Sequence, residues 1–171
     1  MKKIYQLKTL LDVVLWITII ILILSIFMAV FAIISGNPDE MNFKMNGEIV
    51  TTVTQQMIPL MVLTLLGYAS FVGALYQLKQ LVSLFVKRRF FTDKSILILK
   101  QIGSLLFCSC ILIYVPGYLF DVFFNESVKI SFGTVSPESF FFLLIIALFF
   151  FTLSHIFDEA RKLQEETELT V

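Results

Sequence analysis

The amino-acid sequence predicts an all-α integral membrane protein, a four-helix transmembrane bundle in a single domain spanning residues 1–171. Hydrophobic residues make up 58% of the 171 residues and charged residues only 15%, whereas soluble domains are about half apolar and a quarter charged. The apolar residues gather in four stretches of about 20, the length that a helix needs to cross the hydrocarbon core of a bilayer. This composition excludes a disordered chain, a secreted disulfide scaffold and an ordinary soluble enzyme.

The four apolar stretches are the predicted membrane spans. They cover about residues 13–34, 57–76, 101–120 and 139–157, leaving a central loop at 77–100 and a tail at 158–171. Each stretch is too long for a buried strand and too uniform for an amphipathic surface helix, and none alternates like a barrel strand. The first stretch exceeds the length of a signal-peptide core, and no Ala-x-Ala site follows it. We therefore expect an uncleaved anchor rather than a signal peptide.

The positions of lysine and arginine predict the orientation. Eleven of these 13 residues lie at the amino end, in the central loop or in the tail, and only Lys44 and Lys129 lie in the other two connections. Lys and Arg accumulate on the cytoplasmic side of membrane proteins. Both termini and the central loop are therefore expected in the cytoplasm.

Small residues predict where the spans pack, because close approach rather than apolar burial brings helices together in lipid. Those of the second span are Gly67, Ala69, Ser70, Gly73 and Ala74. Those of the first span are Ser25, Ala29 and Ala32. Two pairs in the second span are four residues apart, so each pair shares a helix face. We expect these faces to pack the first span against the second within one chain, and a homo-oligomer through the same motif stays open.

The two external connections are strand-like. Residues 44–53 are rich in β-branched side chains and contain the turn sequence Asn46-Gly47. In residues 128–132, apolar side chains alternate with polar ones. Because an isolated strand is unstable, we expect a small external β-hairpin or sheet formed by the two external loops.

Helix ends outside the membrane have their own signals. The second helix is expected to continue to about Lys87 as an amphipathic extension, and Thr92 is expected to cap the third helix. The tail is expected to stay helical to about Glu166. Pro116, late in the third span, is expected to kink that helix or end its regular part.

Reactive groups are few. His155 is the single histidine and has no second histidine with which to hold a metal. Cys108 and Cys110, two apart on a helix, point to different faces and should not bond to each other. Asp121 is the one carboxylate noted close to a span, at its external end, so no deep charge marks an ion pathway. The sequence has no phosphate-binding glycine loop and no protease or hydrolase motif. We expect no enzyme, no catalytic residues, no cofactor and no metal.

Two functions stay open. The first is a non-enzymatic interaction or regulatory protein that docks a cytoplasmic partner through the central loop and the tail. The residues expected to set topology or dock a partner are Lys87, Arg88, Arg89, Arg161, Lys162, Glu165 and Glu166. The alternative is a small transporter or channel subunit, for which the polar seam would be Gln101, Ser104, Ser109 and Thr152. The expected partner is the lipid bilayer, and no direct binding of nucleic acid is expected, because a net charge of zero gives no long-range attraction to it.

Two segments carry a resemblance. Phe90-Phe91-Thr92-Asp93, before a helix that continues to Ile102-Gly103, and the tail from Ala160 to Val171 resemble the bacterial domain of unknown function 2975 family. The most specific part is Glu-Glu-x-Glu-Leu-Thr-Val at the end, although Thr167 stands where the family usually has Asn or Asp. Family members are typically encoded beside a small repressor-like helix-turn-helix protein. The resemblance implies a bacterial inner-membrane protein that works with a cytoplasmic regulator, and it supplies no catalytic residues.

Overall fold

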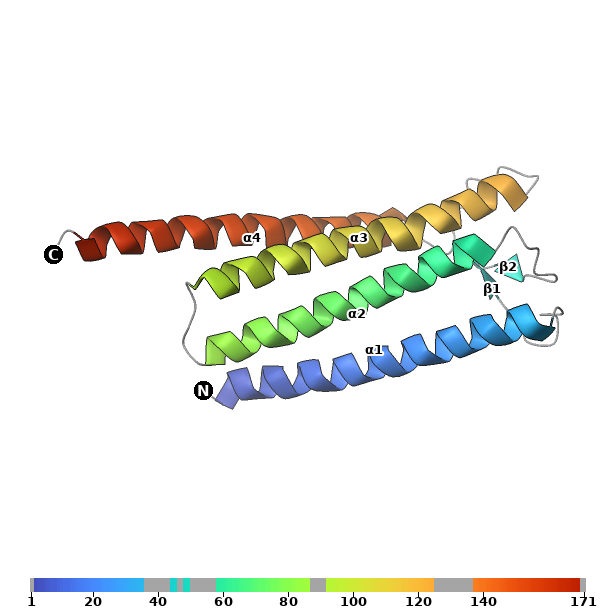
Figure 1. Ribbon diagram of the computed structural model, residues 1–171, viewed down its shortest axis with the longest axis horizontal. Coiled ribbons are helices and arrows are strands. Elements are labelled where there is room, and N and C mark those ends of the chain that lie inside the picture. Colours follow the sequence, from blue (N-terminus) through green and yellow to red (C-terminus); the bar gives the residue numbers. More distant parts are fainter. Residues whose placement is uncertain are drawn as a thin grey trace.

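Four long helices make up the fold (Figure 1). The computed structural model describes residues 2–35, 44–45, 48–49, 58–86, 92–124 and 137–169. The helices are α1 (Lys2–Ser35), α2 (Ile58–Val86), α3 (Asp93–Phe124) and α4 (Pro137–Leu169). Each contains a stretch long and apolar enough to cross a membrane, which confirms the prediction of a multi-pass membrane protein. The 33 residues of α4 extend roughly 50 Å at 1.5 Å per residue, so α4 is longer than a bilayer core is thick.

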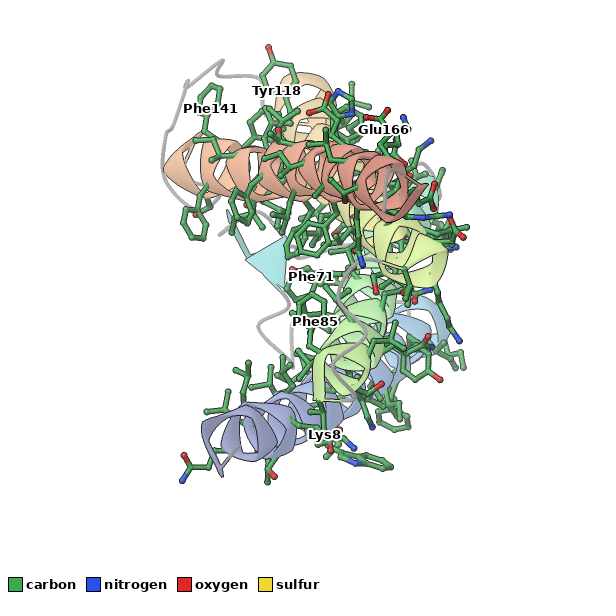
Figure 2. All side chains as sticks on the ribbon, turned by 90° about the vertical axis from the view of Figure 1, so that its left-hand side faces the viewer. Lys8, Phe71, Phe85, Tyr118, Phe141 and Glu166 are labelled. Atoms are coloured by element: carbon green, nitrogen blue, oxygen red, sulfur yellow. The ribbon has the colours of Figure 1, made fainter. Side chains whose placement is uncertain are left out.

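The helices lie side by side in chain order, and both chain termini are at the same end of the molecule (Figure 1). We call this end the terminal side and the opposite end the far side. Helix α2 packs between α1 and α3, and α3 packs between α2 and α4, whereas α1 and α4 make at most marginal contact. Seen from the terminal side, the four helices form a crescent with α1 and α4 at its tips (Figure 2).

The crescent corrects the expectation of a bundle. Four membrane helices are present as predicted, but they form an open curved row instead of closing around one shared core. The physical reason lies in the surrounding lipid. Acyl chains cover the outer face of α1 as well as Leu side chains do, so burial of apolar area gives no drive to bring α1 against α4.

The core of the described residues joins three helices and omits α1. Its fully or nearly buried members are Ala74 and Leu81 from α2, Ile98, Leu99, Ile102 and Leu106 from α3, and Ala147 from α4. Larger side chains pack around them, including Phe71 and Phe85, which Figure 2 shows pointing into the hollow side of the crescent. Because α3 supplies most of the buried residues and has a helix on each side, it is the centre of the fold.

Two very short strands lie in the connection between α1 and α2. Strand β1 (Lys44–Met45) pairs antiparallel with β2 (Glu48–Ile49), with Lys44 opposite Ile49 and Met45 opposite Glu48. This ladder stays within one connection. Residues 128–132 and the expected turn at Asn46-Gly47 lie outside the described residues, so a sheet formed by the two loops has no support here.

The helix ends follow the local sequence signals. Helix α2 continues beyond residue 76 to Val86, and α4 continues through the tail to Leu169. Before α3, the backbone N–H of Ser95 donates to the carbonyl oxygen of Thr92 at 2.9 Å and lies 3.3 Å from its hydroxyl oxygen. Thr92 therefore caps α3 as expected. Pro116 does not end the regular helix, because α3 runs on to Phe124.

Candidate functional site

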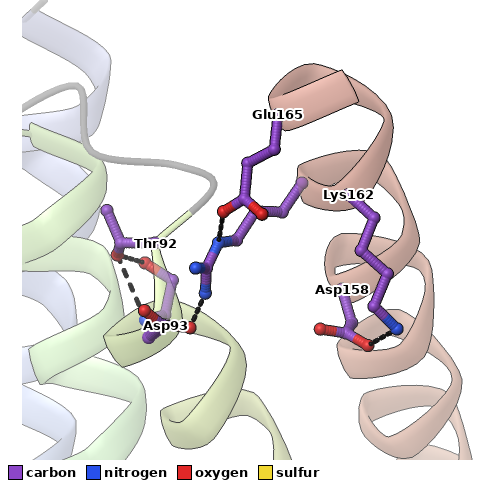
Figure 3. Close-up of polar contacts among 7 residues, drawn as sticks. Thr92, Asp93, Asp158, Lys162 and Glu165 are labelled. Atoms are coloured by element: carbon purple, nitrogen blue, oxygen red, sulfur yellow. Dashed lines mark hydrogen bonds and ion pairs between the residues drawn. The ribbon is translucent and has the colours of Figure 1, made fainter. Parts of the chain in front are cut away.

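An ion-pair cluster joins the start of α3 to the tail of α4 on the terminal side (Figure 3). The Arg161 guanidinium contacts the carboxylate of Asp93, and its Nε donates to Glu165 Oε1 at 2.8 Å. Asp93 is the first residue of α3, where the positive end of the helix dipole also favours a carboxylate. Arg161 thus lies between two carboxylates, one at the start of α3 and one on its own helix.

One further ion pair lies along the tail itself, and one histidine–carboxylate contact, an ion pair only with a protonated imidazole, lies at its start. Lys162 Nζ is 2.8 Å from Asp158 Oδ2, and His155 Nε2 is 3.6 Å from Glu159 Oε1. Residues four apart are neighbours on a helix, so such pairs support helical structure. The hydrogen bond to the Asp158 carboxylate, followed by its negative charge, raises the pKa of the Lys162 ammonium. The tail is therefore a charged helix with local stabilisation along its length.

Buried contacts just inside the ion pairs hold the three core helices together. The Ser154 hydroxyl donates to the backbone carbonyl oxygen of Ile96 at 3.1 Å, joining α4 to α3. The rings of Phe85 and Phe157 stack with centroids 6.2 Å apart, joining α2 to α4. These contacts hold the part of α4 just before the tail against α3 and α2.

A separate ion pair joins α1 to α2. Lys79 Nζ lies 2.7 Å from Asp12 Oδ1, and each side chain is about one third exposed. This pair was not predicted from the sequence, because only Asp121 was considered as a carboxylate close to a span. The signal was present, since Asp12 directly precedes the first apolar stretch and Lys79 follows the second by three residues. Charges within helices that cross a membrane are expected to pair with each other, and these two do.

A groove opens between α2, α3 and α4 towards the far side. Its volume is about 650 Å³, and its walls are mainly apolar, including Tyr68 and Phe71 from α2, Tyr114 from α3, and Phe142 and Ile146 from α4. A volume of this size lies within the usual range for ligand pockets. The groove holds no cluster of charged groups that would fix a polar ligand.

Comparison with known proteins identifies the family. The family described as "Protein of unknown function (DUF2975)" matches residues 37–171. The chain belongs to this family. No curated protein and no solved structure matches the chain. Helix α1 precedes the matched residues, whereas the three core helices and the tail lie within them.

The residues expected to dock a partner are partly placed in this DUF2975 protein. Lys87, Arg88 and Arg89 lie outside the described residues. Arg161 and Glu165 meet each other and Asp93 in the cluster of Figure 3, and Lys162 pairs with Asp158. Glu166 lies exposed further along the tail (Figure 2). The structure thus brings charged tail residues together with the start of α3.

The small residues of α2 mainly face α3, whereas we expected them to face the first helix. A Cβ added to Gly67 would lie 2.7 Å from Ile113 Cγ1 and 3.0 Å from the Ile113 backbone nitrogen, so only glycine fits. At Gly73 the nearest atom would be Leu105 Cδ1 at an ordinary 3.6 Å. Ala74 is buried in the core, Ala69 is exposed, and the Ser70 hydroxyl donates to its own helix. The pattern revealed a packing face without revealing which helix would occupy it.

The polar residues proposed as a transport seam do not converge. Gln101, Ser104 and Thr152 are exposed on the helix surfaces, whereas Ser109 is completely buried. The Thr152 hydroxyl donates to a carbonyl oxygen of its own helix, and the Ser109 Oγ has no hydrogen-bond partner. Among the described residues, these four side chains therefore do not line a common polar path.

The remaining reactive groups are scattered. Cys108 is exposed and Cys110 is buried, and both thiols are free, as their spacing predicted. No group of three or more metal-ligating side chains occurs within the described ranges.

Proposed function

We propose that this DUF2975 protein is a non-enzymatic interaction or regulatory partner of a cytoplasmic protein. It is anchored in the bacterial inner membrane with both termini in the cytoplasm, as the distribution of Lys and Arg favours. The central loop and the α4 tail together form the docking surface.

The supporting observation is the projecting tail. Arg161 meets the first residue of α3, so the part of α4 from Lys162 to Leu169 extends past the core (Figure 1). This part carries exposed charges of both signs, and Arg161 at its base pairs with Asp93 and Glu165. A charged helix that leaves the membrane suits recognition of a soluble protein, since charge complementarity gives specificity and speeds association.

The resemblance described above supports a particular class of partner. It implies a small helix-turn-helix regulator encoded nearby, which would be a cytoplasmic protein. The alternative of a transporter or channel subunit is less well supported, because the four polar residues that it needs do not line one path.

The test is affinity purification of the tagged full-length protein from membranes after mild cross-linking. A variant that ends at Lys162 keeps the Asp93–Arg161 and Asp158–Lys162 pairs but loses the projecting residues. Its control is Ile20→Ala, which alters an exposed apolar residue on α1 and leaves the tail intact. We expect a soluble protein to be captured by the wild type and the control and lost from the shortened variant. Identical sets of captured proteins for all three would contradict the proposal.

A further inference from the structure

The groove between α2, α3 and α4 lies at the middle of the apolar stretch of α2. Tyr68, which lines the groove, is ten residues after the start of α2 at Ile58 and eleven before the charged Lys79. At 1.5 Å per residue, each of these two positions is about 15 Å from Tyr68, which is half of a hydrocarbon core of about 30 Å. Tyrosines gather at membrane surfaces, where the hydroxyl meets water, but Tyr68 is level with the centre of the hydrocarbon core.

The first turns of α4 reach the same level, because α4 is displaced along the helix axes relative to the other helices. Figure 1 shows its start short of the far-side ends of α1, α2 and α3, and its other end projecting beyond them. Cys110 Sγ donates to the backbone carbonyl oxygen of Phe140 at 3.6 Å, and the rings of Tyr114 and Phe140 meet edge to face with centroids 5.3 Å apart. The start of α4 is thus held against α3, and the groove has walls from three helices.

Hydroxyl groups from all three helices line the groove. They belong to Tyr68 of α2, Tyr114 of α3 and Ser139 of α4. The side chains of Tyr114 and Ser139 share a hydrogen bond, whereas the Tyr68 hydroxyl has no hydrogen-bond partner within the part of the chain that the structure describes. A polar group without a partner in the hydrocarbon core is costly, because no water is present to bind it. The Tyr68 hydroxyl is therefore available to a hydrogen-bond acceptor dissolved in the membrane.

The other described walls define the kind of molecule that fits. They are apolar, they include the rings of Phe71 and Phe142, and they carry no charge. A phospholipid does not match the groove, because its polar headgroup stays outside the hydrocarbon core. The ligand must be uncharged, soluble in hydrocarbon and equipped with a hydrogen-bond acceptor. An isoprenoid quinone has these properties, since its uncharged ring bears two carbonyl oxygens and is attached to an apolar chain.

We propose that the groove binds the ring of an isoprenoid quinone, with the Tyr68 hydroxyl donating to one carbonyl oxygen. The rings of Phe71, Tyr114 and Phe142 pack against the quinone ring, and the isoprenoid chain extends into the surrounding lipid. The groove volume of about 650 Å³ is within the usual range for small-molecule sites. This site lies away from the docking surface proposed above and does not depend on it.

Quenching of a tryptophan in the groove tests the proposal, because quinones quench tryptophan fluorescence at short range. The single native tryptophan is first removed by Trp16→Phe. Phe71→Trp then places the reporter in the groove wall. The matched control, Phe141→Trp, places it next to Phe142 on a residue that is 56% exposed and points away from the hollow side of the crescent (Figure 2).

Both reporters are reconstituted in vesicles of phosphatidylethanolamine and phosphatidylglycerol and titrated with a short-chain menaquinone. Quinone that is merely dissolved in the lipid would quench the exposed control at least as strongly as the groove reporter. We expect saturable quenching of Phe71→Trp and weaker, linear quenching of Phe141→Trp. Dioleoylglycerol carries carbonyl oxygens but no ring, so it should not displace the quinone at equal concentration. Displacement by dioleoylglycerol would overturn the assignment to a quinone.

Tyr68→Phe in the Phe71→Trp reporter tests the hydrogen bond. The change keeps the ring and removes the hydroxyl, so the apparent dissociation constant should rise about 2- to 12-fold, as expected for one neutral hydrogen bond. The control Tyr118→Phe removes a hydroxyl from an exposed side chain of α3 that does not line the groove, and the dissociation constant should stay unchanged. Equal dissociation constants for the two variants would overturn the role of Tyr68.

Photolabelling of the unaltered protein makes the result independent of the variants. An azidoquinone should label peptides of α2, α3 and α4 that line the groove, and an excess of menaquinone should prevent this labelling. Labelling spread evenly over all four helices and unaffected by menaquinone would overturn the proposal, as would equal quenching of the two reporters.

Discussion

Helix α1 and the three helices that follow it are held in different ways. Helix α1 has the highest mean hydropathy of the four candidate spans, yet only 11% of its most apolar stretch is buried, the same share as in α4, against 39% for α3. In a soluble protein the most apolar helix would be expected in the core. In a membrane, apolar character no longer predicts burial, because lipid solvates apolar side chains. Helix α3, which is less apolar than α1, is therefore the centre through close packing and specific contacts.

The difference has a structural basis in the contacts of each part. Helices α2, α3 and α4 share a buried cluster, the Ser154–Ile96 hydrogen bond and the Phe85–Phe157 stack. Helix α1 contacts α2, and its described polar link to that helix is the Asp12–Lys79 ion pair. Changes in the contacts among α2, α3 and α4 should therefore affect the whole fold, whereas changes at the Asp12–Lys79 ion pair should affect α1 alone.

Among the changes considered, Gly67→Ala is expected to have the largest effect on the free energy of unfolding. The added methyl group would meet both the side chain and the backbone of Ile113, and the backbone of α3 cannot move aside as a flexible side chain can. We expect a loss of about 1–3 kcal/mol in the free energy of unfolding, typical of overpacking. Unfolding in mixed detergent micelles, followed by circular dichroism, measures it.

Gly73→Ala is the matched control on the same helix. Its new Cβ would lie 3.6 Å from the nearest atom, an ordinary contact, and alanine is also the better helix former. We expect unchanged or slightly increased stability. If both variants lost stability equally, the close contact of α2 with α3 at Gly67 would not be the cause.

A smaller and local effect is expected from Asp12→Asn. The change leaves the Lys79 ammonium without its carboxylate, and partly exposed pairs contribute about 0.2–1 kcal/mol. We expect faster amide hydrogen exchange in α1 while the buried part of α3 keeps its protection, measured by mass spectrometry. The double variant Asp12→Asn/Lys79→Met should recover part of the loss, because no unpaired charge is left. If amide exchange increased equally in α1 and α3, α1 would not be held separately from the core helices.

The same comparison explains which features of the fold and of the candidate site could be predicted from the sequence. Spans, the Thr92 cap and the helical tail are set by neighbours in the chain, so apolar length and local capping chemistry predict them. The open row, the Gly67–Ile113 contact and the Asp93–Arg161 pair join residues far apart in sequence. Nothing local to Gly67 indicates whether its face meets α1 or α3, because in lipid both are equally apolar partners. Asp12 was missed for a different reason: its place directly before the first apolar stretch was a local signal, but only Asp121 was considered as a carboxylate close to a span.

The smallest effect is expected on the helical stability of the tail, which lies outside both α1 and the core of α2, α3 and α4. The pKa of Lys162 is raised by its hydrogen bond to the Asp158 carboxylate, so the folded tail favours the charged ammonium. A raised pKa stabilises below the unfolded value, and the contribution disappears as pH rises through the folded value, here above about pH 10. Amide exchange of residues 158–169, corrected for its intrinsic pH dependence, should therefore stay constant from pH 6 to 9 and increase above pH 10. In Lys162→Met the increase above pH 10 should be absent, while exchange in the core helices should match that of the wild type. An identical pH profile for this variant would mean that the pair does not hold the tail helix.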